Sequence, residues 1–306
     1  MIVVELTISS FLTFNDNPYY KRFDWDFINK SETVLGDYDT QLHEYISYVD
    51  SENQDYYRIY APYHSVYWYS SLSQNVLYNF SDLKTYDSTY QFSLESLLRL
   101  YDFETVHGFT WNITQADIID FTSVKYAVVT TVEELPHKNF ELIGNFKGLP
   151  LYKNLQFQAI IQPRSSLITY DDYQTIRDVS MINSYVISEN KDFNSIAAYI
   201  TDNPSSFSFN DLYGNYVFGT VETNGKSFFV SSIPFDKGWS AKLNGQNLNT
   251  FKVNGGFLGF SVEESGDLVL SFIPQGFKIG AILTVIGIGI LVLLFVLDNR
   301  LKKYFE

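Results

Sequence analysis

The alternation of apolar and polar residues is strongest after Phe157. It repeats in the segments SYVIS, YVFGTVETNGKSFFVSSIPF, SAKLNGQNLNTFKVNGGFLGFSV and GDLVLSFIP. A period of two predicts strands. Three Asn-Gly pairs, which favour tight hairpins because both residues tolerate positive φ, fall among them, at positions 224–225, 244–245 and 254–255. One predicted helix, over residues 193–203, interrupts the series. The pattern predicts a β-sandwich over residues 157–275.

Before this region, helical and strand patterns are mixed. Leu42, Ile46 and Val49 have helical spacing. The segment DYYRIYAP resembles a short strand closed by a proline, and the apolar run over residues 125–131 is typical of a buried strand. We therefore expect a mixed α/β layer over residues 23–156.

A run of nineteen residues, 279–297, carries no charge: IGAILTVIGIGILVLLFVL. A helix of that length covers about 28 Å, close to the hydrocarbon thickness of a bilayer. Fourteen of the nineteen are Ile, Leu, Val or Phe, and each favours insertion by about 0.3–0.6 kcal/mol. The run predicts a transmembrane helix over residues 276–298. The chain as a whole is then β-rich α+β: a mixed α/β layer, a β-sandwich and a single C-terminal transmembrane helix.

The basic residues around this run predict its orientation. Arg300, Lys302 and Lys303 follow it, whereas Lys278 alone stands close before it. The positive-inside rule then places residues 299–306 in the cytoplasm and the bulk of the chain outside a bacterial cell membrane.

The N-terminal residues do not resemble a signal peptide, because they lack a basic start and Glu5 interrupts a short apolar run. Two alternatives remain open. Residues 1–22 could be the end of a preceding membrane helix and a linker in a longer polytopic protein. The chain could instead be a tail-anchored protein whose body lies in the cytoplasm.

The composition of the chain argues against several classes of binding partner and reactive site. The chain has 35 acidic and 21 basic residues, a formal net charge of -14, and no cysteine. The negative charge argues against nucleic acid as a partner, and without cysteine there is no thiolate nucleophile or sulfur-ligated metal. We predict no catalytic residue, no cofactor and no metal site. The 24 Tyr and 26 Phe residues fit either core and sheet surfaces or a surface on which sugars stack.

Small residues recur along the predicted transmembrane helix. Gly280, Thr284 and Gly287 share one helix face, and such a stripe lets another helix approach closely. The predicted partner is a second transmembrane helix.

Two sets of motifs carry a resemblance to a known family. The segment PFDKGWSAKLNGQ, the hairpin FKVNGGFLGFSV and the segment FIPQGFKIG resemble the C-terminal signature of the bacterial YfhO family of membrane proteins. The residues at the motif positions are Pro234, Gly238, Trp239, Gly245, Phe257, Pro274, Gly276, Phe277 and Gly280.

Further upstream, YYRIY, YWYSSLSQN, FTSVKYAVV and LPLYKN are similar to other elements of the family. Their motif residues are Arg58, Lys125, Tyr126, Tyr152 and Asn154. Ser123 stands where the family usually has glycine.

The resemblance implies a role in glycosylation. Family members resemble GT-C glycosyltransferases, in which a bundle of membrane helices transfers a sugar from a polyprenyl-phosphate carrier to lipoteichoic acid or related cell-surface polymers. The presumed catalytic carboxylate lies in that bundle, so no residue here inherits its role. The implied partners are the lipid bilayer, the other helices of the bundle, and a cell-surface glycan or the polyprenyl-phosphate sugar. The alternative is a non-enzymatic, membrane-anchored module that binds or scaffolds cell-surface glycans.

Overall fold

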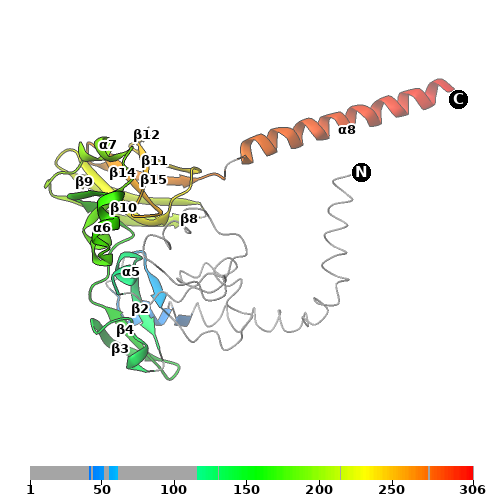
Figure 1. Ribbon diagram of the computed structural model, residues 1–306. Coiled ribbons are helices and arrows are strands. Elements are labelled where there is room, and N and C mark those ends of the chain that lie inside the picture. The colour runs from blue at the N-terminus through cyan, green and yellow to red at the C-terminus, as the bar shows by residue number, and fades with distance from the viewer. Residues whose placement is uncertain are drawn as a thin grey trace.

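The computed structural model describes residues 41–42, 44–51, 55–60, 116–129, 131–213, 215–274 and 276–305. In the last helix, side chains are described for Phe277 and residues 279–294. Three sheets and several short helices make up the described chain (Figure 1), which confirms the predicted β-rich α+β class. Residues 1–22 and the segment YWYSSLSQN lie outside the described residues.

The first sheet contains four strands in the order β1-β2-β4-β3. Their bounds are Arg58–Tyr60 for β1, Val124–Val128 for β2, Phe140–Phe146 for β3 and Leu149–Asn154 for β4. Strand β2 is buried along its whole length, because one apolar cluster covers each face of this sheet. Leu42 and Ile46, which were predicted to share a helix face, pack in one of these clusters. The predicted buried strand therefore exists, with slightly earlier bounds.

Two further sheets follow in the sequence. One has the order β5-β10-β14-β13-β7-β6 and the other β12-β11-β15-β9-β8. The six-stranded sheet comprises Ile161–Arg164 (β5), Ser166–Thr169 (β6), Tyr185–Ser188 (β7), Ser227–Pro234 (β10), Thr250–Val253 (β13) and Phe257–Val262 (β14). The five-stranded sheet comprises Ser205–Tyr213 (β8), Tyr216–Thr223 (β9), Trp239–Leu243 (β11), Gln246–Asn247 (β12) and Gly266–Phe272 (β15).

The two sheets share one apolar core, which makes them the expected sandwich. Val217, Val221 and Leu268 from the five-stranded sheet pack in the same cluster as Phe229 and Phe260 from the six-stranded sheet. The rings of Phe229 and Phe260 are stacked, with centroids 5.8 Å apart.

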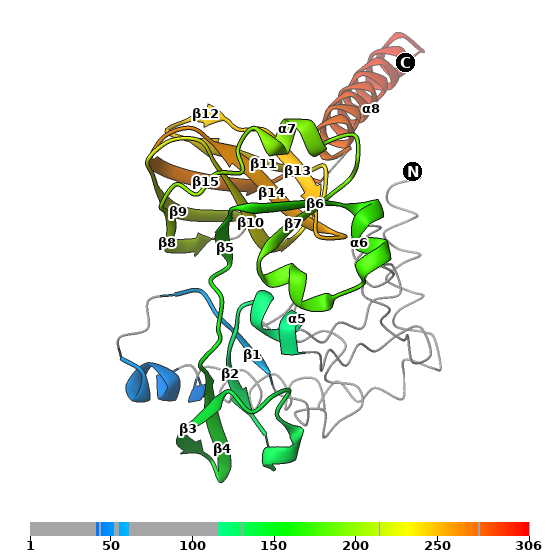
Figure 2. The same cartoon turned by 60° about the vertical axis from the view of Figure 1, so that its left-hand side comes forward.

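The other face of the six-stranded sheet is also covered. Short helical elements lie against it (Figure 2). These are α5 (Ala116–Phe121), α6 (Tyr170–Ile176), the 3-10 helix η3 (Val179–Asn183) and α7 (Phe193–Ala197). Strands β10 and β14 are consequently buried on both faces. The simple alternation of buried and exposed positions expected from the sequence is therefore wrong for these two strands.

Helix α7 is shorter than predicted. It ends at Ala197, whereas the pattern predicted a helix to residue 203. Tyr199 and Ile200 pack against the core after the helix has ended, and Pro204 disfavours a helical conformation at the residue before it. Tertiary packing of Tyr199 and Ile200 accounts for the early end of the helix, and Pro204 disfavours its extension to residue 203.

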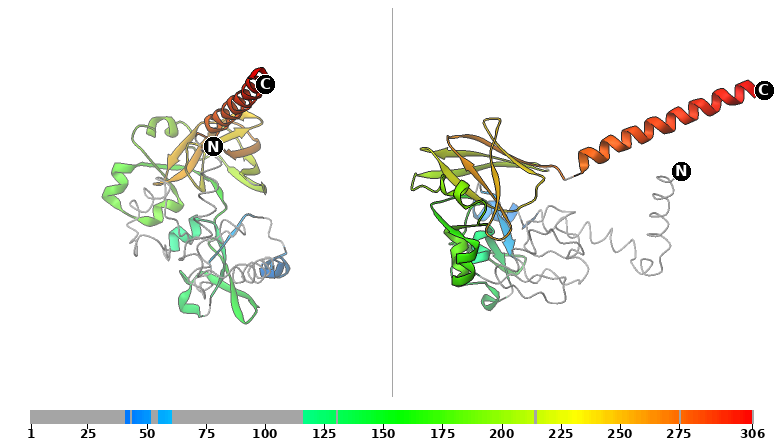
Figure 3. Two further views of the ribbon diagram at one scale, coloured as in Figure 1. Left: turned by 90° about the vertical axis from the view of Figure 1, so that its right-hand side faces the viewer. Right: turned by 45° about the horizontal axis from the view of Figure 1, so that its top comes forward.

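The last helix, α8 (Phe277–Phe305), leaves the end of β15 and extends away from the sandwich (Figures 1 and 3). Its described apolar side chains are exposed, for example Val285 at 70%. Within the described residues, we find no helix with the length and apolarity needed to cross a membrane.

Asn254 joins strands β13 and β7. It is fully buried, with φ of 50°. Its side-chain oxygen accepts a hydrogen bond from the Ile187 amide at 2.8 Å, and its side-chain nitrogen donates to the Tyr185 carbonyl at 3.1 Å. The sequence predicts a surface turn at this Asn-Gly pair. In the structure, the Asn254 side chain also forms buried hydrogen bonds with the backbone of the neighbouring strand β7.

We predict that Asn254→Gly lowers the free energy of unfolding by about 2–3 kcal/mol, because glycine keeps the positive φ but leaves buried backbone groups unpaired. The matched control is Lys147→Gly, at an exposed turn position with φ of 51°, which should change stability by less than about 0.5 kcal/mol. Urea unfolding of the detergent-solubilised chain measures both. Equal effects of the two substitutions would contradict the bridging role.

Candidate functional site

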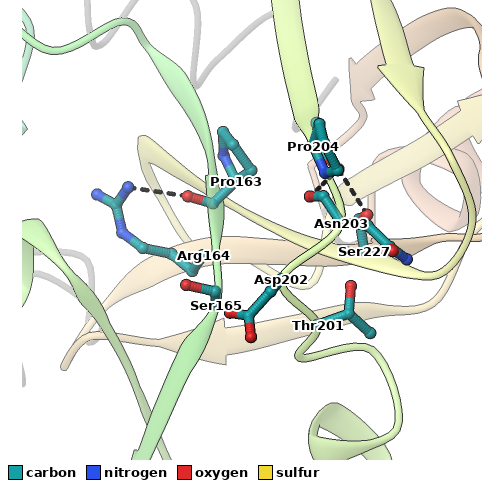
Figure 4. Close-up of a pocket in the computed structure, with 9 residues that line it drawn as sticks. Pro163, Arg164, Ser165, Thr201, Asp202, Asn203, Pro204 and Ser227 are labelled. Carbon is teal, nitrogen blue, oxygen red and sulfur yellow. Dashed lines mark hydrogen bonds between the residues drawn. The ribbon is translucent and has the colours of Figure 1, made fainter.

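The candidate site is a polar cavity of about 310 Å³ at one edge of the sandwich. Its lining comes from β5, from the segment before β8 and from the start of β10 (Figure 4). The lining residues are Pro163, Arg164, Ser165, Thr201, Asp202, Asn203, Pro204, Ser205 and Ser227. No group of His, Cys, Asp or Glu among the described residues could hold a metal ion. The lining side chains offer hydroxyl, amide and carboxylate groups for hydrogen bonding.

Some of these polar groups are held by internal hydrogen bonds. The hydroxyls of Ser205 and Ser227 lie 2.7 Å apart, and each also contacts the Thr223 hydroxyl, at 3.0 and 2.7 Å. By contrast, the side chains of Ser165 and Asp202 are exposed and make no hydrogen bond to other described residues. These two side chains are available to a ligand.

Arg164, the last residue of β5, lines one side of the cavity. Its guanidinium is buried and points away from Asp202 and Asn203 (Figure 4). It donates to the side-chain oxygens of Gln162 at 2.8 Å and Gln158 at 3.1 Å, while its Nε has no partner within the described chain. Burial lowers the pKa of Arg164 to about 10, since neutral amide oxygens compensate the loss of water only in part. No local pattern in the sequence predicts this buried cation.

Motif residue Arg58 lies at the junction between the first sheet and the sandwich. Its Nη1 donates to the Thr122 carbonyl and, at 3.0 Å, to the Ser232 hydroxyl. That hydroxyl also lies 3.1 Å from the Ser123 hydroxyl. Ser123 is fully buried with φ of 64°, which explains why glycine suits this position. The cluster joins β1 to the end of β10.

Motif residues Lys125 and Tyr126 lie on β2 and bind acidic side chains. The Lys125 ammonium lies 2.9 Å from an Asp55 oxygen, and the buried Tyr126 hydroxyl donates to Asp50 at 2.7 Å. Lys153 forms an ion pair with the same Asp50 at 2.6 Å. Burial alone would raise the pKa of Asp50, but hydrogen bonds from Lys153 and Tyr126 bring it below its usual value. Burial, together with the bond to Asp50, raises the pKa of Tyr126.

Motif residue Asn154 takes part in a buried network on β4. Its side chain donates to Asp120 at 2.7 Å, and His137 Nε2 lies 3.0 Å from the same Asp120 oxygen. His137 Nδ1 accepts from the Asn139 amide at 3.1 Å, which assigns the proton to Nε2. Burial raises the pKa of Asp120. Both ring nitrogens of His137 are therefore engaged within the described chain. Motif residue Tyr152, also on β4, packs in the cluster that contains Ile119.

The Gly-Trp motif lies where the sandwich meets α8. A Cβ atom at Gly238 would come within 2.4 Å of the Ile273 carbonyl oxygen, so the position requires glycine for close approach. The Trp239 ring packs 5.2 Å from Phe272. Pro274 and Gly276, which has φ of 80°, form the connection to Phe277 at the start of α8. Pro234 ends β10 directly before this motif.

The remaining motif residues are distributed between turns, core and helix. Gly245 has φ of 82° in the turn between β11 and β12. Phe257 is buried against Phe121 of α5, with ring centroids 4.7 Å apart. A Cβ at Gly280 or Gly287 would meet no described atom within 4 Å, and the Thr284 hydroxyl donates to the Gly280 carbonyl. The predicted helix-packing face therefore stays a prediction.

We predict that Ser123→Gly leaves a free energy of unfolding about 1 kcal/mol higher than Ser123→Ala does. The reason is that alanine, unlike glycine, is strained at a positive φ. Both substitutions lose the hydrogen bond to Ser232. Ser231 is the matched control: it is buried on β10 and donates to the Leu258 carbonyl at 2.8 Å, and in a strand alanine should be the better replacement. Unfolding of the four variants tests this, and the same preference at both positions would refute it.

Comparison with known proteins agrees with the motif assignment. The family model described as "Bacterial membrane protein YfhO" matches residues 188–284. The YfhO protein of Bacillus subtilis (strain 168) is 26% identical over 141 residues, which cover 46% of this chain and 14% of that protein. No solved structure matches the chain. The resemblance first seen in the motifs is thus confirmed for residues 188–284, and the chain is similar to a YfhO family membrane protein over part of that protein's length.

Proposed function

We propose that this chain forms an extracytoplasmic module of a YfhO-type membrane protein. That protein would take part in glycosylating lipoteichoic acid or a related cell-surface polymer from a polyprenyl-phosphate sugar donor. The family match over residues 188–284 carries the proposal, because it covers most of the sandwich and the start of α8. Catalysis is assigned to a bundle of membrane helices, and the described residues would support that bundle.

The proposal includes a membrane anchor. The backbone of α8 stays helical from Phe277 to Phe305, and its sequence over residues 279–297 is uncharged. Described apolar side chains along it are mostly more than half exposed, which is unfavourable in water and favourable in lipid. Arg300, Lys302 and Lys303 would then lie in the cytoplasm.

A second candidate function is non-enzymatic binding of a cell-surface glycan. The cavity beside Asp202 favours it, since carboxylate, hydroxyl and amide groups pair well with sugar hydroxyls. The net charge of -14 opposes contact with a polyanionic backbone. Binding would therefore be directed at neutral sugar units.

The enzymatic proposal predicts a loss of sugar from the surface polymer. Deleting the gene in its bacterium should reduce the hexose-to-phosphate ratio of extracted lipoteichoic acid or related polymer to background, and reintroducing the gene should restore it. Quantitative sugar and phosphate analysis measures the ratio. An unchanged ratio for every extracted polymer would exclude the enzymatic role and leave the glycan-binding one.

The glycan-binding candidate predicts that Asp202→Ala and Ser165→Ala weaken binding of a neutral hexose oligosaccharide. Loss of a hydrogen bond to a charged group should cost Asp202→Ala about tenfold in Kd or more. Asp267→Ala, which removes an exposed carboxylate from β15, is the control and should bind like the original chain. Titration calorimetry in detergent measures all three, and equal Kd values would exclude the cavity as the binding site.

A further inference from the structure

Exposed apolar side chains gather where the sandwich meets α8. Tyr216 begins β9, and Ile273 and Phe277 flank the connection to α8; they are 39%, 40% and 65% exposed. Trp239, at the start of β11, lies at the same end of the sheet, where it is half-buried and packs against the sandwich core. We call Tyr216, Trp239, Ile273 and Phe277 the sandwich base.

Hydrogen bonds hold the sandwich base together. Tyr216 pairs with Ser271 across the β9–β15 ladder, and Trp239 pairs with Phe272 across β11–β15. The Asn215 side chain donates to the Phe272 carbonyl. The Ile273 amide donates to the Gly238 carbonyl at 3.0 Å. The aromatic rings are therefore fixed by the sheet at the point where the chain enters α8.

Charged residues lie at both ends of the five-stranded sheet. At the end opposite the base, Glu222, Glu263 and Glu264 are exposed, and Lys226 lies 3.8 Å from Glu263. Near the base, Lys237 and Asp211 are exposed. Charge alone therefore does not distinguish the two ends, whereas the exposed Tyr216, Ile273 and Phe277 side chains do.

We propose that the sandwich base rests in the headgroup region of a lipid bilayer. Tyr and Trp favour this region because each has an apolar ring and a polar atom. The inference rests on the proposed anchoring of α8. The four Cα–Cα steps from Ile273 to Phe277 can span at most about 14 Å, so anchoring of α8 would keep the base near headgroup depth. Lipid is thus the occupant that this short connection favours over a distant protein or glycan.

The absence of cysteine makes the test direct. Tyr216→Cys and the matched control Glu222→Cys lie at opposite ends of the same strand, and each would carry one environment-sensitive fluorophore. The complete chain is reconstituted in phosphatidylcholine–phosphatidylglycerol vesicles. We expect the label at 216 to be blue-shifted and quenched by lipids that carry a shallow quencher. The label at 222 should report water. Lys237→Cys, at an exposed position two residues before Trp239 of the base, should behave like the label at 216.

Carbonate extraction of the same vesicles separates the two proposals. Retention of the chain with a water-like label at 216 and 237 would overturn the base contact alone. A blue shift without lipid quenching would also overturn it, because protein would then cover the base. Release of the chain by carbonate would overturn both the anchor and the base contact.

Discussion

The burial of strands β10 and β14 on both faces is the constraint on which the rest of the structure depends. Phe229 and Phe260 face the five-stranded sheet, whereas Phe228 faces the helical layer. Neither strand has a solvent-exposed face, so an apolar layer must pack against each of its two faces. The layer on the helical side includes Phe121 of α5, and α5 belongs to the mixed layer that precedes the sandwich. The two parts of the chain therefore complete one core, and stability is shared between them.

The junction at Arg58 follows from the same arrangement. Ser232 near the end of β10 meets Arg58 and Ser123 from the first sheet, and Arg58 supplies several donors in a fixed planar group. Of the upstream motif residues, Arg58 bonds Ser232 of another sheet. Lys125, Tyr126 and Asn154 bond carboxylates outside the sheets, those of Asp55, Asp50 and Asp120. None of these four residues lines the cavity beside Asp202.

The sequence allowed prediction of features with a local signal. The turn at Gly245 and the buried strand β2 follow from Asn-Gly chemistry and a continuous apolar run. The helical cover over β10 could not be predicted, because a strand buried on two faces differs from one buried on a single face only through its tertiary neighbours. Arg164 was missed for a similar reason: its partners are neutral amides that leave no charge pattern. The cavity forms only when β5 and the segment before β8 meet.

The two ends of the sandwich suit different contacts. Strand β9 has eight residues, so its first and last Cα atoms are about 23 Å apart. The base lies at its first residue, and Thr223 at its last residue bonds to Ser205 and Ser227 of the cavity. If the base rests on lipid, the cavity lies at most about that far from the bilayer surface, because it is at the opposite end of the same strand.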